Sequence, residues 1–82
     1  MNASGDIETV IERILRKHGP DGEIEPSLPL GRGGLALDLI ALVEVLLACE
    51  EHFGVILAAE LLAGEPLTVE RLADRVRRSL QP

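Results

Sequence analysis

The residues best placed to do chemistry surround one aspartate at the start of the most apolar stretch. The glycine-rich segment Gly31–Gly34 leads to Asp38, and residues 39–49 are then apolar except for Glu44. An aspartate at such a boundary caps a helix N-terminus. The free backbone N–H groups and the helix dipole at that end favour an anion such as a phosphate ester. We therefore expect the turn from loop to helix at Asp38 to be the functional centre.

Other potentially reactive side chains form no catalytic or metal-binding constellation. His18 and His52 lie near predicted helix ends without a nucleophile beside them, so we interpret both as solvated or end-capping residues. Glu50 and Glu51 are consecutive with His52, so the three side chains point in different directions and form a solvated face. Cys49 lies in the apolar stretch and is interpreted as a buried small hydrophobic residue. The sequence therefore predicts neither an enzyme nor a metal site.

The composition is that of one small domain spanning residues 1–82. With 46% apolar residues and Phe53 as the only aromatic, its core must be aliphatic. The single cysteine excludes an internal disulfide and fits a reducing compartment. The first residues lack the pattern of a signal peptide, and no uncharged apolar run approaches the ~18 residues of a membrane span. We expect a cytoplasmic protein that is monomeric and does not bind membranes.

The charge is acidic and unevenly distributed. A net charge of −6 argues against a nucleic-acid partner, because phosphates require clustered Lys and Arg. Residues 21–65 contain nine acidic residues and a single base, Arg32, whereas residues 66–82 contain two acids and four arginines. An acidic middle section favours partners with basic patches.

Periodicity and capping residues predict four helical segments. The first begins after a Ser4 cap, ends before Gly19-Pro20, and has a continuous apolar stripe: Ile7, Val10, Ile11, Ile14 and Leu15. Residues 19–37 form a long loop with five apolar anchors: Ile24, Leu28, Leu30, Leu35 and Leu37. The second helix covers residues 38–53 and stops at Gly54 in a left-handed conformation.

The C-terminal part completes an all-α fold. A short helix is predicted over residues 58–63, and the last helix follows a Thr68 cap. Its apolar stripe consists of four residues: Val69, Leu72, Val76 and Leu80. The result is three main helices and one short helix, with the long loop between helices 1 and 2. Because the second helix is apolar nearly all round, it is either the central helix of the fold or partly a docking surface.

Three segments carry a resemblance to the acyl carrier protein family: Leu30-Gly31, Leu37–Val45 and Glu50–Val55. That family has Leu-Gly, then Asp-Ser-Leu or Asp-Ser-Ile at the start of its second helix, then Glu-Glu-x-Phe-Gly. The spacing from Asp38 to Phe53 matches without a gap, and Pro66–Val76 is similar to the family's last helix. Each segment is short, but their order and spacing together are fairly specific.

The resemblance implies a four-helix bundle that carries acyl thioesters in fatty-acid or polyketide biosynthesis. The family's cofactor is 4′-phosphopantetheine, which a phosphopantetheinyl transferase attaches from coenzyme A to the serine after the aspartate. By this correspondence Asp38, Leu39 and Ile40 form the attachment motif. Leu39 stands at the serine position and has no oxygen to modify, so the arm cannot be attached to this sequence. No Ser or Thr lies between Ser27 and Thr68 to replace it.

Three interpretations follow from Leu39. The chain is a discrete carrier protein whose attachment serine has been replaced, a natural carrier-like docking or regulatory protein without the arm, or an unrelated helical interaction domain. Under both carrier interpretations, Glu44 matches the acidic partner-facing position, and Leu42 and Val45 are expected on the same exposed face. The partners would be biosynthetic enzymes with basic docking patches. Six other residues are expected to face the core: Ile40, Val43, Leu46, Leu47, Cys49 and Phe53.

Overall fold

The fold consists of three α-helices and one short 3-10 helix. A computed structural model describes the backbone of residues 3–57 and 59–81, and the side chains of residues 6–57 and 60–81. The elements are α1 (Ala3–Arg16), α2 (Leu39–Phe53), η1 (Ala59–Leu62) and α3 (Val69–Leu80). Within those residues there is no strand, and a single antiparallel bridge joins Pro29 to Thr68. The predicted all-α class is confirmed.

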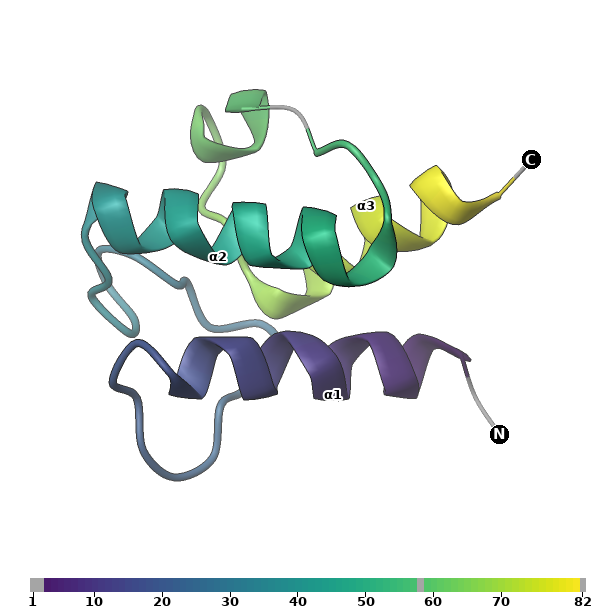
Figure 1. Cartoon of the computed structure of the whole chain (residues 1–82). Helices are drawn as coiled ribbons and strands as arrows, with labels where there is room; N and C mark the ends of the chain where they lie inside the picture. Colours follow the sequence, from purple (N-terminus) through teal and green to yellow (C-terminus); the bar gives the residue numbers. More distant parts are fainter. Residues whose placement is uncertain (1–2, 58, 82) are drawn as a thin grey trace.

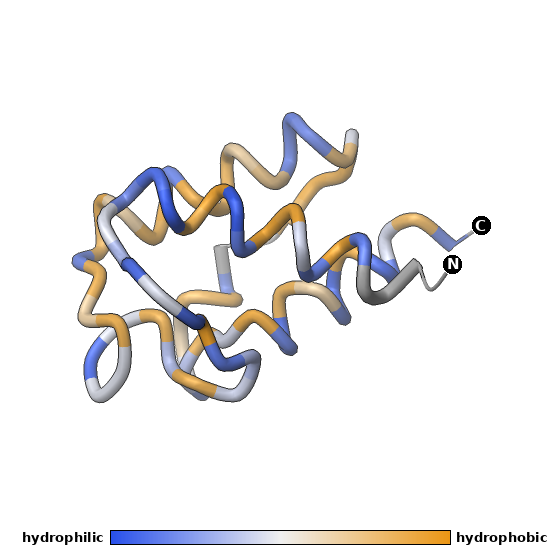
Figure 2. The backbone as a smooth tube through the Cα atoms, turned by 90° about the horizontal axis from the view of Figure 1, so that it is seen from below, coloured by the Kyte–Doolittle hydropathy of each residue, from blue (hydrophilic) through white to orange (hydrophobic). Residues whose placement is uncertain are grey.

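Two helices run side by side and the third packs against them. Figure 1 shows α1 and α2 running in opposite directions, with α3 behind α2. α1 packs against both of the other helices. The start of α2 therefore lies at the same end of the molecule as the end of α1. The long loop joins the two helices, and Figure 2 shows apolar residues interrupting this loop as well as recurring along the helices.

The core is aliphatic, as the composition requires. No polar or charged residue is buried among the described side chains. The sixteen buried apolar residues come from all four helices and the segments between them: Ile7, Ile11, Ile14, Leu15, Ile24, Leu30, Val45, Leu46, Cys49, Leu57, Leu61, Leu67, Val69, Leu72, Ala73 and Val76. Burial of aliphatic side chains on this scale is the main stabilising term for so small a chain.

Two details of the outer helices differ from the sequence-based prediction. α1 already begins at Ala3, so Ser4 lies inside its first turn and is not its N-cap. Leu80 is 52% exposed, whereas the other three residues of its predicted stripe are buried. Figure 1 shows the last turn of α3 extending beyond the end of α2.

Candidate functional site

The start of α2 is capped by Asp38, as predicted. The Asp38 backbone is extended (φ −78°, ψ 173°), and its Oδ1 accepts a hydrogen bond from the Ala41 N–H at 2.8 Å. The Asp38 carbonyl accepts the first helical bond, from the Leu42 N–H at 3.0 Å. At the other end Gly54 adopts the left-handed conformation (φ 67°) and donates to the Glu50 carbonyl. Both predicted boundaries of the helix are confirmed.

Backbone hydrogen bonds close the segment before Asp38 into a compact loop. The fully buried Leu30 donates to the Leu67 carbonyl at 2.8 Å and accepts from the Leu37 N–H at 3.0 Å. The Ala36 N–H donates to the Gly31 carbonyl at 2.8 Å. These bonds join the two ends of the loop to each other and to the segment before α3. The position of Asp38 is therefore set by the core rather than by a free loop.

Gly34 occupies a position in this loop where a residue with a side chain does not fit. A Cβ at position 34 would lie 2.8 Å from the Pro29 carbonyl carbon and closer still to its oxygen. That oxygen also accepts a hydrogen bond from the Leu35 N–H at 3.0 Å. The chain therefore needs a residue without a side chain at this crossing, which is one use of glycine.

The first two helical positions point to solvent. Leu39 is 65% exposed and Ile40 is 72% exposed. Position 39 therefore lies at the first residue of α2, accessible and directly after the Asp38 cap. The expectation that Ile40 faces the core is wrong.

The buried face of α2 differs from the expected one. Leu46 and Cys49 are buried as expected, but Val45 is fully buried and was expected on the partner-facing side. Leu42 is only partly buried and packs against the core. In its present fold the chain cannot offer Val45 to a partner. The physical reason is that Val45, Leu46 and Cys49 lie on one side of the helix, and this is the side that packs into the core.

Two residues expected in the core lie on the surface instead. Val43 is 39% exposed and Leu47 is 53% exposed, and both lie on the same side of α2 as Leu39 and Ile40. We call these four residues the α2 stripe: Leu39, Ile40, Val43 and Leu47. Phe53, which was also expected in the core, is partly buried against it.

Acidic side chains accompany this surface. The Glu44 side chain is 59% exposed, as expected, and its Oε1 lies 3.6 Å from His18 Nδ1 at the end of α1. The His18 side chain is only 22% exposed and contacts Glu44, so His18 is not simply solvated. Glu51 is exposed one turn beyond Leu47. α2 contains no Lys or Arg.

Glu50 has a structural role that the sequence did not reveal. Its Oε2 accepts a hydrogen bond from the Leu57 N–H at 2.7 Å, which holds the segment after α2 against the helix. The interpretation of Glu50 as part of a solvated face is therefore wrong. A carboxylate bonded to a backbone group seven residues later has no sequence signature, because the contact depends on how the chain folds back.

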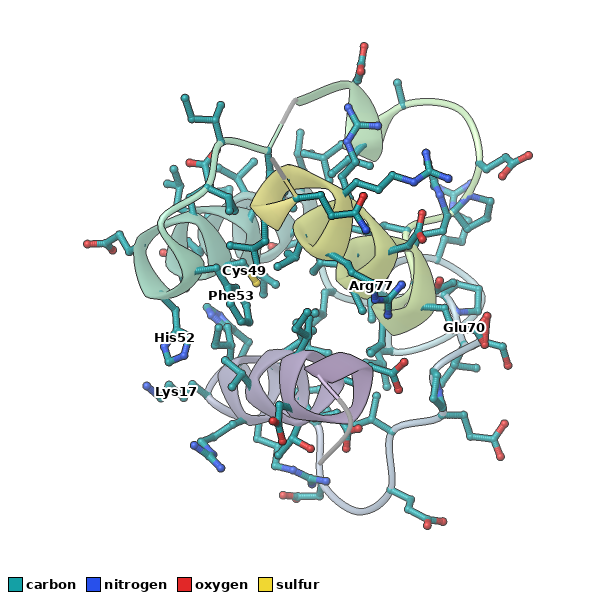
Figure 3. All side chains as sticks on the ribbon, turned by 90° about the vertical axis from the view of Figure 1, so that its right-hand side faces the viewer. Lys17, Cys49, His52, Phe53, Glu70 and Arg77 are labelled. Atoms are coloured by element: carbon teal, nitrogen blue, oxygen red, sulfur yellow. The ribbon has the colours of Figure 1, made fainter. Side chains whose placement is uncertain are left out.

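The remaining reactive groups near α2 are Cys49 and His52. Figure 3 shows Cys49 pointing into the space between the helices and His52 on the outer side of α2. Burial raises the pKa of the Cys49 thiol to about 12, so it is not a nucleophile at neutral pH. The His52 ring makes an edge contact with Phe53, with ring centroids 4.9 Å apart. Among the residues with described side chains, no three His, Cys, Asp or Glu residues are grouped to hold a metal ion.

A cavity of about 220 Å³ opens beside the loop. It is formed by Pro29, Gly31 and Arg32 of the loop, Leu42 of α2, Leu62 of η1 and residues 64–67. Arg32, the only Lys or Arg between residues 21 and 65, lines this cavity.

No protein-family model, curated protein or solved structure matches this chain. Within residues 3–57 and 59–81, none of the helices has both the length and the apolar composition needed to cross a lipid bilayer.

Proposed function

We propose that this chain is an acyl-carrier-protein-like domain that binds biosynthetic enzymes through α2 without carrying the arm itself. In this proposal α1, α2, η1 and α3 are the four helices of a carrier-type bundle. The observation that carries the proposal is the geometry of position 39. It is the first helical residue after the Asp38 cap and 65% exposed, and an unbroken helix leads from it to the Gly54 stop.

The start of α2 is chemically suitable for a phosphodiester. Of the first N–H groups of the helix, that of Ala41 already bonds to Asp38. The helix dipole and the remaining N–H groups favour negative charge at that end. A serine hydroxyl at position 39 would be exposed to a transferase, and its phosphopantetheine would leave the surface without crossing the core. Leu39 prevents this step, so in this proposal the protein acts through non-covalent contacts.

The acidic surface supports the choice of partners. Glu44 and Glu51 are exposed on α2, and residues 21–65 have a single base. Enzymes of fatty-acid or polyketide type with Lys and Arg at the docking site would be attracted to this field. We place these contacts in the cytoplasm, where such enzymes and coenzyme A occur together.

One observation favours a docking role over a carrier that has merely lost its serine. The exposed Leu39 side chain continues the apolar surface formed by Val43 and Leu47. A leucine whose only effect was to prevent modification would not need exposed apolar residues beside it on the helix.

The proposal is tested by restoring the hydroxyl. Leu39→Ser should gain one phosphopantetheine group when incubated with coenzyme A and a promiscuous phosphopantetheinyl transferase, as measured by intact mass. The unchanged protein and an Ala41→Ser variant, which places a hydroxyl two residues further along the same helix, should gain none. Failure of the folded Leu39→Ser variant to react would remove the carrier-like scaffold from consideration.

A further inference from the structure

The cavity beside the loop has two opposite charges that are not paired with each other. It is lined by Arg32 of the loop and by Glu65 after η1, and both residues are exposed. Among the residues with described side chains, neither charged group has a hydrogen-bond or ion-pair partner. All four arginines of α3, by contrast, have partners. The free cation and the free anion therefore determine which ligand this cavity suits.

The rest of the cavity wall is mostly apolar. Leu42 of α2, Leu62 of η1 and Leu67 lie around it, together with Pro29 and Pro66. Leu67 is buried, whereas Leu42 and Leu62 are half-buried and pack against the core. An apolar wall with a few polar groups that fix the orientation of the ligand is the usual composition of a small-molecule site.

Hydrogen bonds hold the walls of the cavity in place. The Arg71 guanidinium donates to the carbonyls of Glu65 and Pro66 at 2.6 and 2.9 Å. The Leu30 N–H donates to the Leu67 carbonyl at 2.8 Å, which joins the loop to the same segment. Figure 1 shows this segment passing α2 on its way from η1 to α3. The walls are therefore formed before a ligand arrives, so binding does not have to order them.

The volume of the cavity limits the ligand to a small molecule. About 220 Å³ corresponds to roughly seven water molecules at ~30 Å³ each. Sites for drug-sized ligands have volumes of ~300–1,000 Å³. A nucleotide or a long acyl chain is too large to be enclosed here, whereas a molecule of the size of one amino acid fits.

We propose that this cavity binds a small zwitterion with an apolar side chain, which is the chemistry of a free aliphatic amino acid such as leucine. Arg32 pairs with the carboxylate of the ligand and Glu65 with its ammonium group. The apolar side chain of the ligand contacts Leu42 and Leu62. Binding is non-covalent. The inference goes beyond the proposed function, because it involves neither Asp38 nor position 39.

Ligands of other chemistry fit the cavity less well. A carboxylate without an ammonium group would be repelled by Glu65, and an amine without a carboxylate would be repelled by Arg32. A metal ion lacks ligands, because no three His, Cys, Asp or Glu residues are grouped to hold one among the described side chains. A second hollow, formed by Glu12 and residues 23–26, is lined by three carboxylates and no base, so it does not offer the same pair of charges.

The test is a titration of the isotope-labelled protein with leucine, followed by the backbone amide signals in two-dimensional NMR. The amides of Arg32, Gly64 and Glu65 should shift with one common dissociation constant, and those of residues 23–26 should not shift. Isocaproate is leucine without the ammonium group, and isopentylamine is leucine without the carboxylate. Each should bind at least about tenfold more weakly than leucine, because each loses one charge-assisted contact. Glycine should also bind more weakly, because it has no apolar side chain.

Two pairs of variants test the assigned charges. Arg32→Gln should weaken leucine binding by at least about tenfold, whereas Arg13→Gln should leave it unchanged. Arg13 is a matched control, because it is exposed on α1 and also has no partner among the described side chains. Glu65→Gln should likewise weaken binding, whereas Glu70→Gln, an exposed position on α3, should not. All four residues lie outside the core, so the variants should fold.

Any of three results would overturn the proposal. These are leucine-induced shifts no larger at the cavity than at residues 23–26, binding of isocaproate or isopentylamine as tight as that of leucine, or equal dissociation constants for Arg32→Gln and Arg13→Gln. Leu39→Ser, the variant that tests the proposed function, should bind leucine like the unchanged protein. Failure of leucine binding would therefore leave the proposed function standing, and failure of modification would leave this inference standing.

Discussion

Replacing Gly34 by alanine tests whether the loop before α2 is a rigid support. Neither Gly34 nor Gly31 has a positive φ, so alanine is tolerated at both positions as far as the backbone angles are concerned. The two differ in the space available. At Gly34 the new methyl group would overlap the Pro29 carbonyl, whereas at Gly31 the nearest atom, Leu42 Cδ1, is at an ordinary 3.6 Å.

The expected loss can be worked out from these contacts. Overlap in a packed region typically costs about 1–3 kcal/mol. Moving Pro29 away would also break the hydrogen bond from Leu35 to its carbonyl, at about 1 kcal/mol. Gly34→Ala should therefore lower the free energy of unfolding by about 2–4 kcal/mol. Gly31→Ala should raise it by up to about 1 kcal/mol, because alanine reduces the entropy of the unfolded chain.

The assay is urea unfolding followed by circular dichroism, since the protein has no Trp or Tyr for fluorescence. Both variants should keep the slope of the wild type while their midpoints move in opposite directions. A Gly34→Ala midpoint equal to that of the wild type would show that the Pro29 carbonyl leaves room for a side chain at position 34. An equal loss in Gly31→Ala would instead show that the loop tolerates no side chain rather than one specific overlap.

Three further predictions concern the ends and the interior of α2. Asp38→Ala should cost about 1 kcal/mol in urea unfolding by removing the bond to Ala41, and Asp38→Asn should cost less because it keeps an acceptor. Glu50→Ala should speed hydrogen exchange at the Leu57 amide, its hydrogen-bond donor, and Glu50→Gln should do so less. Because burial raises the Cys49 pKa from 9.0 to about 12, the folded protein should resist thiol reagents at pH 8 and react after unfolding. The free energy of unfolding that this buried thiol contributes should be complete below pH 9 and be lost as the pH rises toward 12, since only the unfolded form ionises in that range. A Cys49→Ala variant should not show this decrease in stability between pH 9 and 12.

Both ends of α2 and the start of α3 could be predicted because they depend on local chemistry, whereas the predicted Ser4 cap of α1 was wrong. Asp38 and Thr68 accept hydrogen bonds from the N–H groups three residues later, and Gly54 takes the left-handed conformation that stops a helix. Each of these effects needs only a few neighbouring residues. The apolar stripe of α1 could be predicted equally well, because polar residues occupy the opposite face of that helix.

The orientation of α2 could not be predicted, because it depends on packing against distant parts of the chain and not on local chemistry. With apolar residues on nearly every side, several faces fit the core equally well, and only packing against the rest of the fold selects Val45, Leu46 and Cys49. The resemblance to carrier proteins did not resolve this, since it led to Val45 outside and Ile40 inside. The hydrogen bond from the Leu57 N–H to Glu50 could not be predicted either, because it depends on where the chain folds back after the helix.

We propose that position 39 corresponds to the attachment position of a carrier-like scaffold. Its most direct test is the intact mass of Leu39→Ser after incubation with coenzyme A and the transferase. We predict that this variant gains a single phosphopantetheine group while the unchanged protein and Ala41→Ser gain none. A folded Leu39→Ser protein that remains unmodified, with a known carrier protein fully modified in the same reaction, would contradict the claim.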